Sequence, residues 1–279
     1  MSAVPRRGRL AGLGWPGRVF LVIGGLLLAV ALVGGLVAPY APDALVGRTF
    51  LPPGPDHLLG TDSLGRDVLS RILSGGRTAV ILAVAAMVVA EVVGIAVGLL
   101  AGYHGGRIDA ILMRAVDVLL AFPALLLVLI LAAGLGVGPR VLVIGVALVN
   151  IPGIARIVRA ATLEVGRSGF VESAIVRGES TFSVLRREIL PNVMTTIVAD
   201  GGVRLAAAFL IIAGLNFVGI GIQPPTADWS TMVAENRSYI TLQPWTIIAP
   251  TACIALFTIS VNVVAESLAR ARSRSGGRP

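Results

Sequence analysis

The 279-residue chain contains no lysine, one cysteine and few charged residues, and each scarcity excludes a class of protein. A nucleotide-binding P-loop needs a lysine that reaches the phosphates, so this chain cannot hydrolyse ATP through that motif. The single cysteine, Cys253, excludes a disulfide framework and a cysteine metal site. If ATP drives this protein, a separate chain must hydrolyse it.

Charged residues make up only 14% of the chain, whereas hydrophobic residues make up 56% and the mean hydropathy is +0.89. A soluble domain could not bury apolar runs of roughly 20 residues, the length that crosses a bilayer as a helix. The composition therefore predicts an integral membrane protein. The runs are continuous rather than alternating, which favours helices over a β-barrel.

About six apolar runs have the length of a transmembrane helix. They are Val19–Ala38, Ala79–Tyr103, Val118–Leu135, Val141 to about Val158, Val193–Ile222 and Ile247–Ala265. The fold expected from them is all-α, with about six transmembrane helices. Pro123 and Pro152 are expected to kink the third and fourth helices, because proline removes a backbone hydrogen bond.

The arginines indicate the orientation, because basic residues near span ends are retained on the cytoplasmic side. With the N-terminus inside, sixteen arginines lie on the cytoplasmic side, six lie outside and Arg204 lies within a span. Both termini are therefore expected in the cytoplasm. The expected parts are tails 1–18 and 267–279 and a membrane domain 19–266 with outer loops 39–77 and 223–245.

The basic N-terminus and the net charge of +8 each permit another interpretation. The N-terminus resembles a signal peptide, but its apolar run is long for one, so a first transmembrane helix is favoured. The arginines lie at membrane edges without interleaved aromatic residues, so anionic lipid and cytoplasmic proteins are expected as partners and nucleic acid is not.

A polar segment, residues 164–192, interrupts the apolar runs on the expected cytoplasmic side. Gly178 separates two short helices within it, and Ser180 is suited to cap the second. Pro191 is expected to end that second helix before the next span. The sequence therefore predicts a compact helix–turn–helix at the cytoplasmic surface.

The second of these helices is amphipathic. Phe182, Leu185 and Ile189 fall at positions i, i+3 and i+7, which predicts one apolar stripe. Charged side chains such as Arg186 lie outside that stripe. This arrangement is suited to docking, although most amphipathic loops of membrane proteins bind nothing.

The spacing of the segment resembles the cytoplasmic signature of ABC importer permeases, which is Glu-Ala-Ala, three residues, Gly and then Ile-x-Leu-Pro. The matching residues are Glu172, Ser173, Ala174, three residues, Gly178, twelve residues and Pro191. Ser173 replaces an Ala but is small enough for the same packing. Ile189 lies one place later than the usual Ile, with Glu188 in its position, and Ile189–Asn192 resembles the ending common in the peptide branch.

Three other stretches resemble the dipeptide, oligopeptide and nickel permeases in the same order along the chain. They are Leu59–Arg77, Ala115–Leu127 and Gly214–Val233. Within the first, Asp62 is suited to cap a helix, along which Arg66, Asp67 and Arg71 can form pairs.

The resemblance implies the type I ABC importer permease fold and a place in the bacterial plasma membrane, as the second permease of its transporter. It also implies a second homologous permease subunit, two ABC ATPase subunits and an extracytoplasmic substrate-binding protein. ATP and Mg would bind the ATPase subunits, so no cofactor, metal site or catalysis is expected in this chain. The implied solute is a short peptide, with nickel or another small solute as the alternative.

The resemblance further implies that segment 164–192 inserts into a groove of the ATPase and couples ATP hydrolysis to the spans. ATP-driven closure of the ATPases would rock those spans between inward-facing and outward-facing states. The residues assigned to coupling are Glu172, Ala174, Gly178, Phe182, Leu185, Arg186, Ile189 and Pro191.

Charged residues inside spans are expensive and usually face a cavity or a partner. Asp200 and Arg204 are four residues apart, which favours a structural ion pair, whereas Glu91 could either pair or line the pathway. In a stand-alone secondary transporter Glu91 or Asp200 would carry ions, but no obvious internal repeat supports that class. An intramembrane enzyme is disfavoured because His57 and His104 lie far apart in sequence and no nucleophile accompanies them.

Overall fold

The structure is a computed structural model that describes residues 15–223 and 225–276. Within these residues the chain forms helices and two isolated β-bridges but no strand, so the expected all-α fold is confirmed. The α-helices are α1 (Trp15–Val37), α2 (Val68–His104), α3 (Gly106–Leu120), α4 (Ala124–Leu135), α5 (Pro139–Val165), α6 (Gly169–Val176), α7 (Thr181–Ser183), α8 (Leu190–Val218), α9 (Trp229–Asn236) and α10 (Trp245–Gly276). A π-helical turn, Val184–Ile189, joins α7 to α8, and a 3-10 turn, Arg237–Tyr239, follows α9.

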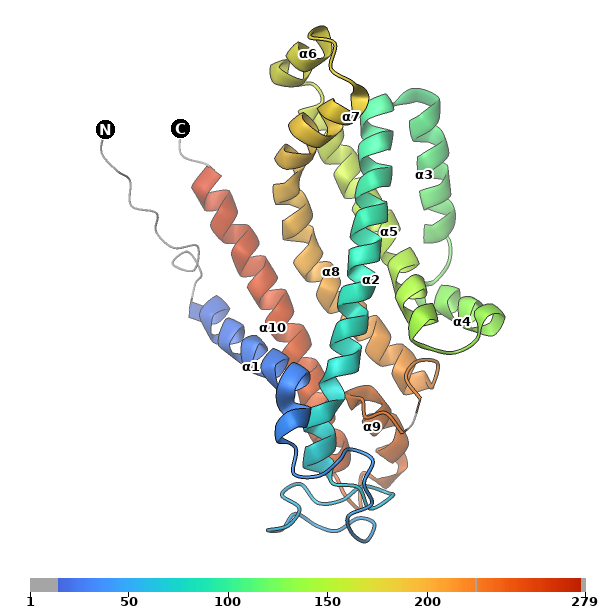
Figure 1. Cartoon of the computed structure of the whole chain (residues 1–279), viewed down its shortest axis with the longest axis vertical. Helices are drawn as coiled ribbons and strands as arrows, with labels where there is room; N and C mark the ends of the chain where they lie inside the picture. Colours follow the sequence, from blue (N-terminus) through green and yellow to red (C-terminus); the bar gives the residue numbers. More distant parts are fainter. Residues whose placement is uncertain (1–14, 224, 277–279) are drawn as a thin grey trace, which may run out of the picture.

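Four long helices, α2, α5, α8 and α10, run along the length of the molecule (Figure 1). α1 packs against α2 and α10, whereas α3 and α4 pack against α5. α6 and α7 stand at one end of the molecule, and α9 lies at the opposite end near the loop that joins α1 to α2 (Figure 1). The long apolar helices therefore separate two ends of different structure.

Small residues allow α2 and α5 to approach closely. A Cβ atom added to Gly94 would lie 2.7 Å from Ile154 Cγ2, and one added to Gly98 would lie 2.6 Å from Val158 Cβ. One turn further, a Cβ atom on Gly102 would lie 2.7 Å from Thr162 Cβ. Lipid supplies no hydrophobic force between helices, so close packing of this kind is what holds them together.

Five helices among the described residues are long and apolar enough to cross a membrane. α3 and α4 together make a sixth candidate, bent by 88°. This bend corrects the expected third span, 118–135, because the helix breaks within it at 121–123. Pro123 cannot donate a hydrogen bond to continue α3 and instead occupies the N-cap of α4, whereas Pro152 lies inside α5 without ending it.

The start of α2 lies within the expected outer loop 39–77, where an aspartate caps the helix. The capping residue is Asp67, whose Oδ2 accepts a hydrogen bond of 2.8 Å from the backbone N–H of Ser70. The prediction that Asp62 caps this helix is therefore wrong. Asp62 is instead buried and forms ion pairs with Arg66 and Arg71.

Four buried or half-buried charged groups connect the α1–α2 loop to α9. Arg66 Nε donates to Asp62 Oδ2 over 2.7 Å, and Arg71 Nη1 donates to the same oxygen over 2.6 Å. Both arginines also contact Glu235 of α9, at 2.7 and 2.9 Å. Burial opposes ionisation of Asp62. The backbone hydrogen bonds from Arg66 and Leu64 and the positive charges of Arg66 and Arg71 outweigh burial and hold the pKa of Asp62 below its usual value.

An aromatic side chain also fixes α9 against α2. Trp229 is buried, and its Nε1 donates a hydrogen bond of 2.8 Å to the carbonyl oxygen of Ile72. A Cβ atom on Gly76 would lie 2.5 Å from Trp229 Cζ2, so only glycine leaves room for the ring. The ion-pair group and this ring together make α9 and the start of α2 one packed unit.

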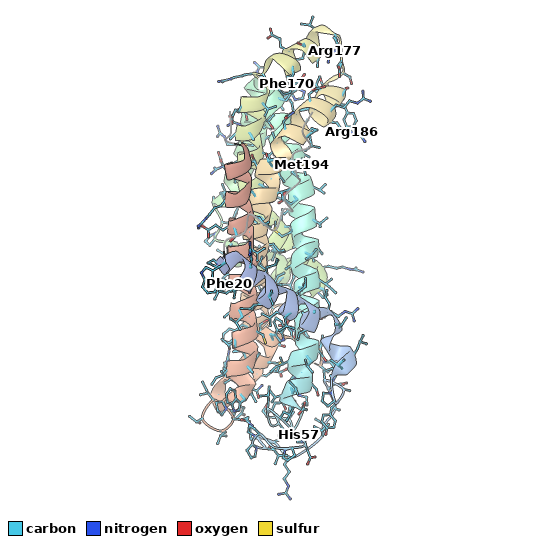
Figure 2. All side chains as sticks on the ribbon, turned by 90° about the vertical axis from the view of Figure 1, so that its left-hand side faces the viewer. Phe20, His57, Phe170, Arg177, Arg186 and Met194 are labelled. Carbon is cyan, nitrogen blue, oxygen red and sulfur yellow. The ribbon has the colours of Figure 1, made fainter. Side chains whose placement is uncertain are left out.

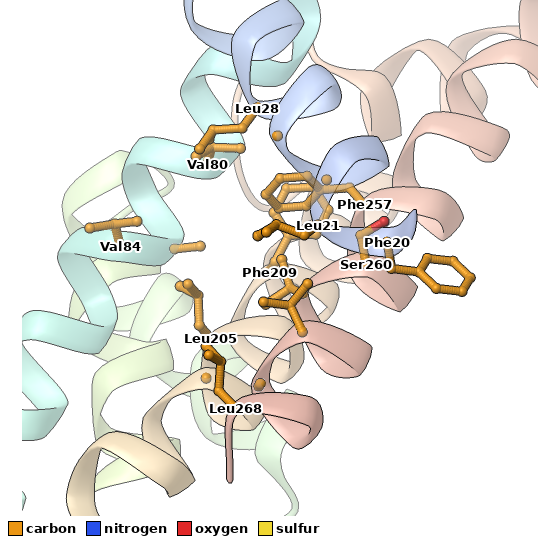
Figure 3. A pocket seen from close by; sticks show the side chains of 17 residues that line it. Phe20, Leu21, Leu28, Val80, Val84, Leu205, Phe209, Phe257, Ser260 and Leu268 are labelled. Atoms are coloured by element: carbon orange, nitrogen blue, oxygen red, sulfur yellow. The ribbon is translucent and has the colours of Figure 1, made fainter. Parts of the chain in front are cut away.

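An apolar cavity of about 380 Å³ lies between α1 and α10 on one side and α2 and α8 on the other (Figure 3). Leu205 and Phe209 of α8 line it together with Val80 of α2 and Phe257 of α10. The Ser260 hydroxyl is its polar lining group. The side of α8 that faces this cavity is therefore apolar.

We expect Asp62→Asn to destabilise the folded chain by about 3–5 kcal/mol, because it leaves two buried arginines short of negative charge. Thermal unfolding of the purified protein in detergent would measure the loss. The matched control is Glu266→Gln, because Glu266 pairs with Arg270 in an exposed position near the end of α10 that is worth about 1 kcal/mol at most. Equal shifts in Tm for the two variants would contradict the structural role of the buried group.

The same group predicts a pH dependence. The pKa of Asp62 is lower in the folded chain than in the unfolded chain, so its contribution is present at neutral pH and is lost as the pH falls below about 4. In Asp62→Asn this acid-dependent part of the unfolding free energy should be absent. An unchanged acid profile in the variant would show that Asp62 is not the titrating group.

Candidate functional site

Segment 164–192 folds as the expected helix–turn–helix at the end of the molecule occupied by α6 and α7 (Figure 1). α6 ends in a Schellman motif, in which Gly178 N–H donates to Ile175 O over 2.9 Å and Glu179 N–H donates to Ala174 O over 3.2 Å. Gly178 has a φ of 78°, in the left-handed region that glycine adopts without strain. The turn therefore requires glycine at this position.

Side chains fix the turn that follows. Ser180 caps α7 as predicted, because its Oγ accepts a hydrogen bond of 3.3 Å from Ser183 N–H. Glu179 accepts hydrogen bonds from Arg177 Nη2 at 2.8 Å and from Ser183 Oγ at 2.9 Å. The hydrogen bond from Arg177, followed by that from Ser183, lowers the pKa of the Glu179 carboxyl.

The underside of the element is packed. Val171 and Ala174 of α6 are fully buried, as are Val184 and Ile189 of the π-helical turn that α6 contacts. Leu185 is also buried beside them, and all five belong to the continuous core. The element is therefore seated on the helix bundle by its own apolar face.

Its outer surface carries exposed apolar side chains. Val176 is 82% exposed and Phe182 is 70% exposed. Phe170 and Ile175 of α6 are also exposed. The predicted stripe is therefore correct for Leu185 and Ile189 and wrong for Phe182. Phe182 lies in the short helix α7, ahead of the π-helical turn that contains Leu185 and Ile189, and its side chain is turned away from the core.

Pro191 does not end the helix, contrary to expectation. The helical run Thr181–Val218 continues through it for 38 residues. Leu190 N–H donates to Leu185 O, five residues back, and this wider turn accommodates the proline ring that would clash with a regular α-helical turn. The element formed by segment 164–192 is thus continuous with α8.

The remaining predicted residues fall on the outer side of the element. Glu172 in the first turn of α6 and Arg186 are both exposed. Figure 2 shows Phe170, Arg177 and Arg186 at this end, opposite His57. The outward position of Phe170 and Val176 was missed from the sequence, although α6 has more apolar residues than one face of so short a helix can bury.

The three charged residues inside the spans lie together. Arg204 Nε donates to the Asp200 carboxylate, which confirms the expected ion pair along α8. Glu91 of α2 interacts electrostatically with both of them. This charged cluster, defined as Glu91, Asp200 and Arg204, lies in the middle third of α2 and α8, far from α6.

No group of three side chains suited to hold a metal ion occurs in the part of the chain that the structure describes. What the described residues build is a set of apolar spanning helices, a charged cluster among them and a packed helical element that projects from one end. This arrangement defines a polytopic membrane protein with a packed helical element at one end of its long helices.

The family model described as the binding-protein-dependent transport system inner membrane component matches residues 94–274. The chain belongs to this family. It is a permease subunit of an ABC importer rather than an enzyme, it lies in the bacterial inner membrane, and it works with an ATPase and a substrate-binding protein.

Among curated relatives, the glutathione transport system permease protein GsiD of Pectobacterium atrosepticum is 37% identical over 245 residues, which cover 87% of this chain and 81% of the relative. The di/tripeptide transport system permease protein DppC of Pseudomonas aeruginosa is 35% identical over 259 residues, covering 88% and 85%.

Solved structures support the fold. An inward-facing form of the MetNI methionine ABC transporter has a chain with a TM-score of 0.52 and 16% identity, covering 68% of this chain and 93% of its own length. A second match, to an amino acid ABC transporter crystallised with histidines, has a TM-score of 0.53 and 17% identity, covering 69% and 89%. The type I ABC importer permease fold is thereby confirmed.

We expect Gly178→Ala to loosen the turn after α6, because a non-glycine residue in the left-handed region costs about 1 kcal/mol. Hydrogen exchange of the amides in residues 169–176 would measure this as roughly fivefold lower protection. Gly169→Ala is the matched control, because both glycines have open space around a new Cβ and only Gly178 has a positive φ. The same loss in both variants would contradict the argument from φ.

Proposed function

We propose that this chain forms half of the translocation pathway of an ATP-driven importer of short peptides and that segment 164–192 couples it to a separate ATPase. The observation that carries the proposal is the exposed apolar surface of Phe170, Ile175, Val176 and Phe182 on an otherwise packed element. Exposed apolar groups of this size outside a membrane mark a site of protein–protein contact.

The geometry of the element favours a groove in a partner. Its underside is seated in the core, and its turn is held by the Schellman motif and by the Glu179 hydrogen bonds. A preformed element loses little conformational entropy on docking. Exposed Arg177 and Arg186 lie beside the apolar side chains and can pair with carboxylates at the edge of such a groove.

Transmission to the membrane follows from the continuous helix. Movement of the element by ATPase closure displaces Thr181–Val218 as one rod, and this rod carries Asp200 and Arg204. Rigid-body movement of this kind rocks the spans between inward-facing and outward-facing states. ATP and Mg bind on the ATPase subunits, since this chain has no lysine for a P-loop.

The orientation is part of the proposal. The N-terminal end of α1 and the C-terminal end of α10 point towards the end that carries α6, which supports one side of the membrane for these helix ends and segment 164–192 (Figure 1). The arginine bias supports the cytoplasm as that side. The other half of the pathway is a second, homologous permease subunit, with lipid around the pair.

A short peptide is the solute that the relatives favour. The two relatives named above are described as permeases for glutathione and for di- and tripeptides, which are all short peptides. Both are similar to this chain over more than four-fifths of its length. The substrate-binding protein selects the solute before it reaches this chain, so the ligand purified with that protein would identify it.

We expect Phe182→Asp to weaken retention of the co-expressed ATPase by roughly tenfold or more, since a charge replaces an apolar anchor in a desolvated groove. Affinity purification of the tagged chain from membranes would measure the ATPase retained. Leu242→Asp is the control, because Leu242 is similarly exposed, at 63%, but follows α9 at the opposite end. The proposal fails if Phe182→Asp retains the ATPase as fully as Leu242→Asp does, or if the chain alone transports peptide into liposomes.

A further inference from the structure

The three residues of the charged cluster come from two helices, Glu91 from α2 and Asp200 and Arg204 from α8. The Asp200 and Arg204 side chains are 22% and 20% exposed, so the cluster reaches the surface of this subunit. Glu91 Oε2 is buried and has no hydrogen-bond partner among the described residues. The Asp200–Arg204 ion pair therefore lies beside Glu91 without donating a hydrogen bond to Glu91 Oε2.

Two glycines make room for the charged groups. A Cβ atom on Gly153 of α5 would lie 2.3 Å from Arg204 Nη1, and one on Gly201 of α8 would lie 3.0 Å from Glu91 Oε1. Any larger residue at Gly153 would displace the guanidinium group. Gly153 of α5 and Gly201 of α8 therefore leave the space that the Arg204 and Glu91 side chains occupy.

The charges of the cluster do not balance. Asp200 and Arg204 form an ion pair, so an ionised Glu91 adds one negative charge that the single arginine of the cluster does not balance. Holding an acidic side chain at this depth costs about 2.5–3.5 kcal/mol on insertion scales. A structural pair does not need the third charge, whereas a site that receives a cation during transport does.

The cluster lies on the polar side of α8. Leu205 and Phe209 point into the apolar cavity towards α1 and α10 (Figure 3), whereas Gly201 and Arg204 face α2 and α5. A charged solute gains nothing from the apolar cavity, whereas the cluster offers it charged groups. The position of the cluster in the middle third of α2, α5 and α8 suits a solute that is partway across the membrane.

We propose that Glu91, Asp200 and Arg204 form a transient binding site for the ammonium group of the transported solute, with Glu91 as its principal counter-ion. The proposal rests on the proposed function, since every unmodified peptide carries an ammonium group at its N-terminus or on a lysine. An ammonium group donates three hydrogen bonds, and a carboxylate that accepts them replaces part of the water lost in the membrane.

The test uses the complete importer, with partner permease, ATPases and binding protein, in proteoliposomes. Two tripeptides of one lysine-free sequence, one with a free and one with an acetylated N-terminus, are supplied at saturating concentration on the binding protein, and uptake per ATP hydrolysed is measured for each. In Glu91→Gln the ratio of free-peptide to acetylated-peptide uptake should fall by roughly tenfold. Glu91→Asp should restore most of the ratio.

Glu266→Gln is the matched control, because Glu266 forms a comparable i, i+4 pair with Arg270 in an exposed part of α10, and its ratio should equal that of the wild type. A Glu91→Gln variant that slows both peptides equally would overturn the proposal in favour of a structural role. Wild-type importer that transports neither peptide would contradict the peptide assignment itself, and this proposal with it.

Discussion

The close contact between α2 and α5 is the interaction on which the rest of the structure depends. Gly94, Gly98 and Gly102 lie against Ile154, Val158 and Thr162 with no space for a side chain between the two backbones. This contact sets the distance from α2 to α5, and α8 packs against both of them. Glu91 can therefore meet Asp200 and Arg204, and α6 is held on a fixed base. In lipid, where apolar surface alone does not drive association, close packing is the available source of this stability.

Two features of the chain make it suited to transmit motion rather than to perform chemistry. The run Thr181–Val218 is continuous despite Pro191, because the π-helical turn before the proline widens the helix. At the other end, Trp229 and the ion pairs of Asp62 and Glu235 join α9 to α2. A movement of α6 can reach the charged cluster without bending the rod, while the opposite end stays packed.

Local chemistry allowed much of the site to be predicted from the sequence. Gly178 and Ser180 act through backbone groups within four residues, and Asp200 and Arg204 meet within one helix, so their patterns suffice. Predictions failed where distant packing decides the outcome. Pro191 is tolerated inside a helix because a π-helical turn precedes it. Asp62 forms ion pairs instead of capping a helix, because Arg71 and Glu235 come together only in the folded chain. The break at Pro123 shows that an apolar run does not reveal where a helix bends.

The most direct measurement is site-specific photo-crosslinking from α6. Cys253 is the only native cysteine, so in a Cys253→Ser background a maleimide photo-crosslinker can be attached at Val176→Cys alone. Illumination of the assembled importer should yield an adduct with the ATPase subunit whose amount changes when ATP is added, because the proposal has α6 move when the ATPases close. An adduct with the binding protein, or none with the ATPase in an importer that hydrolyses ATP, would contradict the assignment of α6 as the coupling helix.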